Sequence, residues 1–177
     1  MDVVALDLQG LKLVRPRVHR DGRGAFVEAY QSDRYADVGI GAAFVQDNHS
    51  ISQAGTLRGL HFQARPGQGK LVRVAAGKIF DVAVDVRRGS PTFGRWQGVE
   101  LDGHDHHQLW VPVGFAHGFC VLEGPAHVLY KTTSTFDPGE ERAIAWNDRD
   151  LAIDWPLADP VLSDRDRAAP SFALVAA

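Results

Sequence analysis

Two short segments hold the residue types that proton transfer requires. The first is GTLRGLHFQ, where Arg58, His61 and Gln63 lie on a predicted β-strand whose alternate residues face the same side. Arg58 stands three residues before His61, so their side chains should face opposite sides unless Gly59 marks a bulge or a twist. The second is PVGFAHGF, which contains His117. Histidine changes charge near neutral pH, so both segments are candidates for acid–base chemistry.

Metal binding is the alternative use of these histidines. The two segments resemble the paired motifs of the cupin superfamily, in which two histidines of the first motif, a glutamate and the histidine of the second hold a divalent ion. Gln63 stands where the second of those histidines would stand, and a neutral amide is a poor ligand for a transition metal. The sequence therefore predicts no metal at these positions and favours an organic ligand.

A second group of histidines, HDHH from His104 to His107, also has metal-binding residue types. Consecutive residues on a turn or strand point in different directions, so no set of ligands with a defined spacing arises. The pattern favours a surface turn over a metal site.

Composition excludes several classes of protein. A chain of 177 residues with 45% hydrophobic content can bury one core, which predicts a single domain over residues 1–177. A net charge of −3 gives no positive field for nucleic acid. A single cysteine, Cys120, an N-terminus without a signal pattern and frequently interrupted hydrophobic runs predict a cytoplasmic protein that does not contact a membrane.

The elements that must position these residues are predicted to be β-strands. Short runs rich in Val, Phe, Tyr and Leu begin at Leu11, Phe26, Leu71, Ile79, Leu109 and His127. Turn-forming residues separate them at the spacing of an all-β sandwich or barrel, and residues 32–38 are the best short helix. The alternation in IFDVAVDV predicts one wetter face, with Asp81 and Asp85 in solvent.

Two further segments suggest surface structure when each is taken alone. DGRGAFVEAY predicts a hairpin or loop closed by Gly22 and Gly24, with Arg23 and Glu28 in solvent. The C-terminal AIDWPLADPVLSDRDRAAPSF is rich in proline and predicts a loop-like tail. We expect this tail to wrap the barrel and bring polar groups to it.

Taken together, the segments from Leu11 to Phe172 resemble the dTDP-4-dehydrorhamnose 3,5-epimerase family. The resemblance rests on DGRGAFVEAY, QDNHSIS, LRGLHFQ, GKLVRVAAGKIFDVAVDVR, GSPTFGRW, VPVGFAHGF, LYKTTSTFDP and LSDRDRAAPSF. Agreement of many ordered motifs is specific, although each motif alone is weak. It implies an all-β, cupin-type jelly-roll β-barrel with short peripheral helices, and an isomerase of a dTDP-linked 4-keto-6-deoxyhexose.

The resemblance also implies a role for each matching residue. His61 would be the base, oriented by Asp166, with Tyr130 as the proton donor on the opposite face and Lys70 at the enolate oxygen. The sugar and phosphate region would be lined by Arg58, His117 and Phe136. Nucleotide contacts would fall on Arg23, Phe26, Glu28, Gln46, Asp47, Asn48 and Glu141. Some of these are expected from the partner subunit of a homodimer that exchanges strands.

The chemistry of epimerisation is consistent with these roles. A proton beside a ketone is too weakly acidic for histidine unless a cation stabilises the developing enolate, and Lys70 and Arg58 are suitable. A carboxylate such as Asp166 fixes the tautomer of the base and raises its basicity. Because the substrate's own carbonyl holds the electron pair, no cofactor is expected, and neither G-x-G-x-x-G nor a P-loop occurs.

The sequence leaves several alternatives open. Many 3,5-epimerases have tyrosine where STFDP here has Phe136, so the enzyme could invert C3, C5 or both. A mono-epimerase of an antibiotic deoxysugar pathway is therefore an alternative to an enzyme of rhamnose synthesis. A metal-dependent cupin enzyme and a non-catalytic cupin that binds sugar nucleotides are the remaining hypotheses.

Overall fold

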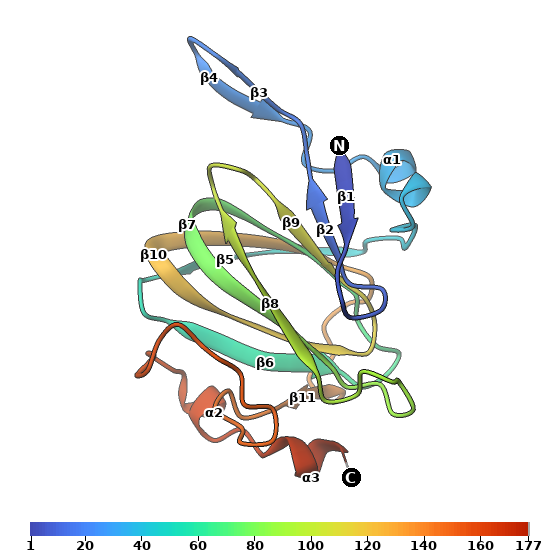
Figure 1. The fold of residues 1–177 in the computed structure, drawn as a ribbon, viewed down its shortest axis with the longest axis vertical. Coiled ribbons are helices and arrows are strands. Elements are labelled where there is room, and N and C mark those ends of the chain that lie inside the picture. Colours follow the sequence, from blue (N-terminus) through green and yellow to red (C-terminus); the bar gives the residue numbers. More distant parts are fainter. Residues whose placement is uncertain (177) are drawn as a thin grey trace.

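The computed structural model describes residues 1–176 and consists mainly of strands around an apolar interior (Figure 1). The strands are β1 (Asp2–Ala5), β2 (Lys12–Arg15), β3 (Val18–Asp21), β4 (Gly24–Val27), β5 (Gln46–Ser52), β6 (Leu57–Gln63), β7 (Lys70–Asp85), β8 (Trp96–Asp102), β9 (Gln108–Val111), β10 (Phe115–Thr132) and β11 (Glu141–Ala143). The helices are α1 (Ser32–Asp37), α2 (Asp164–Arg167) and α3 (Phe172–Ala176). The predicted all-β class is confirmed, as is the short helix that begins at Ser32.

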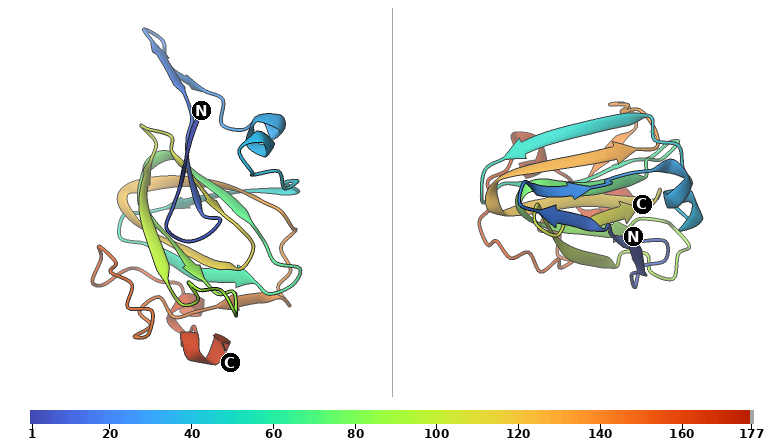
Figure 2. Two further views of the ribbon diagram at one scale, coloured as in Figure 1. Left: turned by 45° about the vertical axis from the view of Figure 1, so that its right-hand side comes forward. Right: turned by 90° about the horizontal axis from the view of Figure 1, so that it is seen from above.

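Two long strands organise the barrel. β7 and β10 pair antiparallel along most of their length (Figures 1 and 2). The first part of β7 pairs with β9, which continues through β2 to β1, and its second part pairs with β8. The first part of β10 pairs with β6, which continues to β11, and its second part pairs with β5. This arrangement places β5, β6, β7 and β10 around one cavity.

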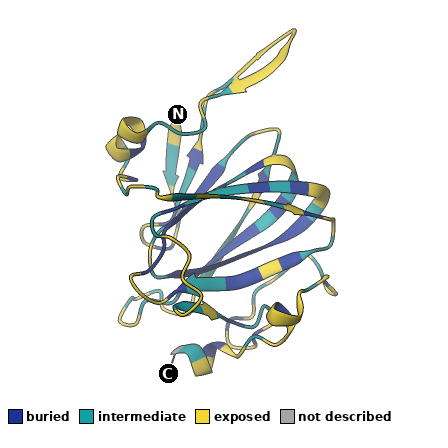
Figure 3. Cartoon of the chain, turned by 180° about the vertical axis from the view of Figure 1, so that it is seen from behind, coloured by how far each residue is buried: buried dark blue, intermediate teal, exposed yellow. Residues whose placement is uncertain are grey.

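Aliphatic and aromatic side chains fill the barrel. The central cluster includes Val72, Leu109, Phe115, Phe119 and Val128, all of them buried. The interior strands are correspondingly dark in Figure 3. Burial of each such side chain contributes roughly 1.5–3 kcal/mol. This apolar packing holds the site-bearing strands in a fixed arrangement.

The prediction that Asp81 and Asp85 face solvent is wrong, since the structure buries both side chains completely. One face of β7 packs into the central cluster, and the other packs against the C-terminal segment through Val82 and Val84. A strand that is covered on both sides has no wet face, whatever its pattern of alternation. The aspartates instead accept internal hydrogen bonds, Asp85 from Arg87 and Asp81 from His117.

The predicted hairpin is confirmed as β3 and β4, which pair only with each other in a separate sheet. It extends away from the barrel, and most of it is exposed (Figures 1 and 3). Arg23 lies in its turn, and the side chain of Phe26 is 69% exposed. The predicted strand that begins at Phe26 is shorter than expected, because β4 ends at Val27 and the chain then turns toward α1.

The C-terminal segment wraps one side of the barrel, as predicted, but it also contains two short helices (Figure 1). Leu151 and Phe172 pack against the outer face of β7, and the Ser163 hydroxyl caps the start of α2. None of the helices within residues 1–176 is long and apolar enough to cross a membrane. The segment thereby holds α2 beside β6.

Candidate active site

A cavity of about 290 Å³ opens between β5, β6, β7, β10 and α2. Its lining contains nearly all the groups that the sequence singled out for acid–base chemistry. The residues that line the cavity are Ser50, Arg58, His61, Lys70, His117, Phe119, Tyr130, Ser163, Arg165 and Asp166. A second cavity of about 360 Å³ shares His61, Lys70, Tyr130 and Arg165 with it. The two cavities therefore adjoin each other at these shared residues.

His61 and Asp166 form a hydrogen-bonded pair across 105 positions of sequence. The Nε2 atom of His61 lies 2.7 Å from Oδ1 of Asp166, and the carboxylate is the more deeply buried partner. Burial opposes ionisation of Asp166, but hydrogen bonds from His61, Ser163 and the Gly59 amide outweigh it and lower the pKa of the carboxyl group. An ionised carboxylate can only accept, so Nε2 carries the proton and Nδ1 is left as the basic nitrogen.

Arg58 and His61 line the same cavity although they lie three residues apart on β6. The pairing of β6 with β10 shifts register at this point, and Gly59 adopts a φ of +119°. A Cβ atom at Gly59 would stand 2.5 Å from Cα of Gly118, which only glycine avoids. Gly59 therefore marks the bulge or twist under which the sequence allowed both side chains to face one side.

Positive charge is concentrated beside the histidine. Nζ of Lys70, at the start of β7, donates to the backbone carbonyl of His61 at 3.3 Å. Burial lowers the pKa of Lys70 to about 8, against the opposing negative charges of Asp81 and Glu141. A lysine with this pKa is mostly protonated at neutral pH and loses its charge as pH rises through 8.

Tyr130 lies on β10 and borders the same cavity as His61. Burial raises the pKa of its phenol, and the positive charge of Arg58 opposes that rise. Arg58 is itself held by a hydrogen bond from Nε to Oγ of Ser52, at 2.9 Å. The phenol therefore remains protonated at neutral pH, next to a cation that can stabilise its anion.

A second pair of histidine and aspartate lies next to the first. His117 is the partner of His61 in the β6–β10 ladder, and its Nε2 atom lies 2.8 Å from Oδ1 of Asp81. Sequence reasoning missed Asp81, because its alternation with valines resembled an exposed face. It also missed Arg165, which borders both cavities and forms an ion pair with Glu141 at 2.6 Å. Its position next to Asp166 in LSDRD was the available signal for Arg165.

The adjoining cavity brings together four other predicted residues, Gln46, Asn48, Phe136 and Glu141. Nε2 of Gln46 donates to Oδ1 of Asn48, and Oε1 of Gln46 accepts from the Phe136 amide, each at 2.9 Å. The Phe136 side chain is half exposed at this opening. These contacts offer polar edges and one aromatic face to a ligand.

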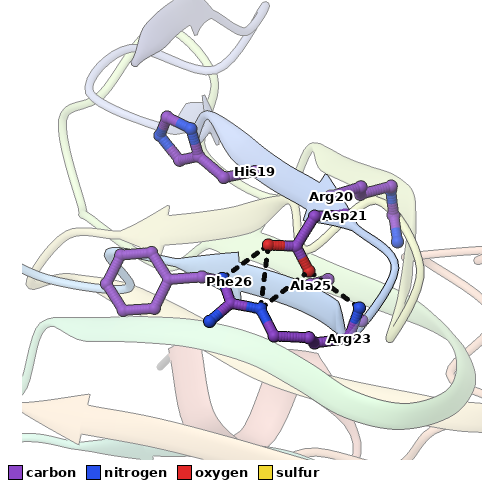
Figure 4. A pocket seen from close by; sticks show the side chains of 7 residues that line it. His19, Arg20, Asp21, Arg23, Ala25 and Phe26 are labelled. Carbon is purple, nitrogen blue, oxygen red and sulfur yellow. Dashed lines mark hydrogen bonds and ion pairs between the residues drawn. The ribbon is translucent and has the colours of Figure 1, made fainter.

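The remaining predicted residues lie elsewhere in this chain. Arg23 and Phe26 border a separate concavity on the hairpin, where Asp21 binds Arg23 (Figure 4). Glu28 and Asp47 border another cavity, which adjoins the cavity of His61 at Tyr130. The structure does not bring these four residues to the cavity of His61.

The residues weighed for metal binding have other surroundings. Gln63 donates from Nε2 to the Thr135 carbonyl and accepts at Oε1 from the Asp137 amide. Its side-chain amide therefore holds the loop between β10 and β11. His104 and Asp105 lie in the predicted surface turn, where their ligand atoms and that of Asp102 lie within 4.8 Å of one another.

Comparison with known proteins shows the same family throughout. The sequence family described as dTDP-4-dehydrorhamnose 3,5-epimerase matches residues 5–173. The dTDP-4-dehydrorhamnose 3,5-epimerase of Pseudomonas aeruginosa is 52% identical over 98% of this chain and 97% of its own length. The chain is therefore a carbohydrate epimerase, and it belongs to the dTDP-4-dehydrorhamnose 3,5-epimerase family.

Solved structures agree with this assignment. The dTDP-6-deoxy-D-glucose-3,5-epimerase of Legionella pneumophila, in complex with dTDP-4-keto-L-rhamnose, superimposes with a TM-score of 0.95 at 49% identity over 98% of this chain and 94% of that one. A 4-keto-6-deoxy sugar epimerase from the novobiocin biosynthetic gene cluster of Streptomyces spheroides superimposes with a TM-score of 0.95 at 39% identity. The match covers 99% of this chain and 89% of that one. The cupin-type barrel expected from the sequence is consistent with these likenesses.

The burial of Lys70 gives a direct prediction. Its ammonium should titrate near pH 8, well below an exposed lysine, because desolvation disfavours the charged form. Side-chain NMR of selectively labelled lysine should show this midpoint, with the Lys70→Arg variant identifying the resonance. A midpoint above pH 10 for Lys70 would contradict the described environment.

Proposed function

We propose that the enzyme inverts C3, C5 or both in dTDP-4-keto-6-deoxy-D-glucose through an enolate, with His61 as base and Tyr130 as acid. One observation carries this proposal: His61 and Tyr130 line one cavity together with Lys70 and Arg58. The ligand of the Legionella pneumophila relative, a dTDP-linked 4-ketosugar, supports the substrate class.

The first step is proton abstraction beside the ketone. Nδ1 of His61 takes the proton, the C–H electron pair forms a carbon–carbon double bond, and the carbonyl electrons move to the C4 oxygen. The resulting imidazolium is stabilised by Asp166 through Nε2. Lys70 and Arg58 stabilise the enolate oxygen, because a fixed cation is most effective where charge develops away from water.

The second step returns a proton to the opposite face of the same carbon. The phenol of Tyr130 donates it, the enolate electron pair forms the new C–H bond, and the ketone is restored. Burial keeps this phenol protonated before the step, and Arg58 favours the tyrosinate after it. The electron pair begins and ends on carbon, so the balance requires no oxidant or reductant.

For the carrier, we propose recognition by residues of two subunits. Gln46, Asn48 and Glu141 border the cavity within one chain, and Arg165 there supplies an additional cation. Phe26 and Arg23 are exposed on a hairpin that extends from its own barrel, where an aromatic face and a guanidinium suit a pyrimidine base and a phosphate. In a homodimer with exchanged hairpins, Arg23 and Phe26 of each chain would complete the site of the other chain, together with Glu28 and Asp47.

The reaction is tested by proton exchange. In deuterated water with dTDP-4-keto-6-deoxyglucose, the enzyme should incorporate deuterium beside the ketone, and NMR will show whether C3, C5 or both exchange. His61→Asn should lower the exchange rate about 1,000-fold, as expected when a general base is lost. His49→Asn, on an exposed position of β5, should leave the rate unchanged.

The outcomes separate the competing hypotheses. Exchange that persists in His61→Asn would remove His61 as the base. Exchange that a chelator abolishes and a divalent metal restores would favour a metal-dependent cupin enzyme. Tight binding of the sugar nucleotide without exchange would favour a non-catalytic binding protein.

The exchanged hairpin is tested by mixing two inactive variants. One chain carries His61→Asn, and the other carries the double change Arg23→Ala and Phe26→Ala. Half of randomly formed dimers are mixed, and each mixed dimer has one complete site, so activity should recover to about a quarter of wild type. Refolding or subunit exchange of the mixture, followed by the deuterium assay, measures this recovery. If the mixture stays as inactive as its components, the hairpin does not act across subunits.

A further inference from the structure

The two buried aspartates of β7 have very different surroundings. Asp85 accepts hydrogen bonds from Arg87, Ser90 and Thr92, so both of its oxygens are satisfied. These bonds outweigh the effect of burial and hold the pKa of Asp85 well below its usual value. Asp85 thus closes the turn that follows β7, as a structural carboxylate does.

The side chain of Asp81 has a single hydrogen-bonding partner among residues 1–176. Oδ1 accepts from His117, whereas Oδ2 is buried and accepts no hydrogen bond from any described group. Its neighbours on the same face of β7 are Ile79 and Ala83, which belong to the apolar cluster. Burial of a carboxylate among such residues is unfavourable, so stability does not account for an aspartate here.

The contact with Asp81 determines which ring nitrogen of His117 carries the proton. An ionised carboxylate can only accept, so the proton of the neutral imidazole must reside on Nε2. Nδ1 is then the remaining ring nitrogen, and it is an acceptor. His117 borders the cavity, so this acceptor suits a hydroxyl group of a bound sugar.

The charge of Asp81 also acts on Lys70. The negative charges of Asp81 and Glu141 both raise the pKa of Lys70 against the effect of burial. Asp81 has the larger effect of the two. The other charged or titratable groups around this cavity are Arg58 and His61 on β6, His117 and Tyr130 on β10, and Arg165 and Asp166 on α2. Among the anions around Lys70, Asp81 comes from the same strand, at a position fixed by the β7–β10 ladder.

We infer that Asp81 is a positioning residue of the site, which holds His117 as a hydroxyl acceptor and keeps the Lys70 ammonium charged. The inference rests on the proposed epimerase function, since it assigns Lys70 to the enolate oxygen and His117 to the sugar. Asp81 does not reach the substrate; it acts through these two side chains. The buried carboxylate is thus explained by the site and not by the core.

The test is the pH profile of deuterium exchange in Asp81→Asn. An amide has the shape of the carboxylate but no charge, so Lys70 should lose its proton at a lower pH and the alkaline limb should move to lower pH. We also expect about a 100-fold lower rate at pH 7, the size of a disturbed acid–base group. Asp85→Asn is the matched control, and it should lower the melting temperature while leaving the alkaline limb in place.

A second measurement does not depend on activity. The ¹⁵N NMR shifts of His117 in the wild-type protein at pH 8 should show a protonated Nε2 and an unprotonated Nδ1. Protonation of Nδ1 in this state would overturn the inference, as would an alkaline limb of Asp81→Asn that coincides with that of the wild type. A wild-type enzyme that exchanges no deuterium would instead overturn the proposed function. In that case the NMR result would still test whether Asp81 fixes the tautomer of His117.

Discussion

The hydrogen bond between His61 and Asp166 is the interaction on which the site depends. It joins a strand in the middle of the chain to a short helix near its end, at a distance of 2.7 Å. The carboxylate reaches this position because the C-terminal segment packs on the outer face of β7 through Leu151 and Phe172. Apolar packing on one side of the barrel wall therefore holds the carboxylate that fixes the tautomer of a histidine on the other side.

The interior electrostatics follow from the same constraint. The barrel places Lys70 and two histidine–aspartate pairs around one cavity, with much of their surface removed from water, whereas Arg58 borders the same cavity at an exposed position. Charges held in such surroundings interact more strongly than in solvent and need no reorganisation when an enolate forms. The cost is a set of buried ionisable groups, which the surrounding strands must hold by packing and hydrogen bonds.

Local sequence signals predicted the features that depend on local chemistry. The glycines around Arg23 predicted the hairpin, and Gly59 between Arg58 and His61 was the position at which a bulge could bring both side chains to one side, as the register shift does. The grouping of His61, Lys70, Tyr130 and Asp166 came from the family resemblance, because strands distant in sequence provide no spacing from which to derive it. The structure places these four side chains around one cavity.

Features that depend on which surfaces the fold covers were not predictable in this way. Asp81 and Asp85 alternate with valines as residues of a wet face do, and only the packing of the C-terminal segment shows that β7 has none. In the sequence, Arg165 is one charged residue of a polar tail. Its place at the cavity follows only from the packing of α2 beside β6. The hairpin residues remain apart from the cavity within one chain, so the role that we propose for them depends on the association of two chains.

The central claim is that His61 and Tyr130 act on opposite faces of one bound ketosugar. It is tested most directly by measuring, for Tyr130→Phe in deuterated water, the rate of deuterium incorporation and the rate of net inversion in the same NMR experiment. We predict that incorporation stays within about tenfold of wild type while inversion falls by at least about 100-fold, because the base remains and the acid is lost. If both rates are retained equally, Tyr130 is not the proton donor and the two-face account is wrong.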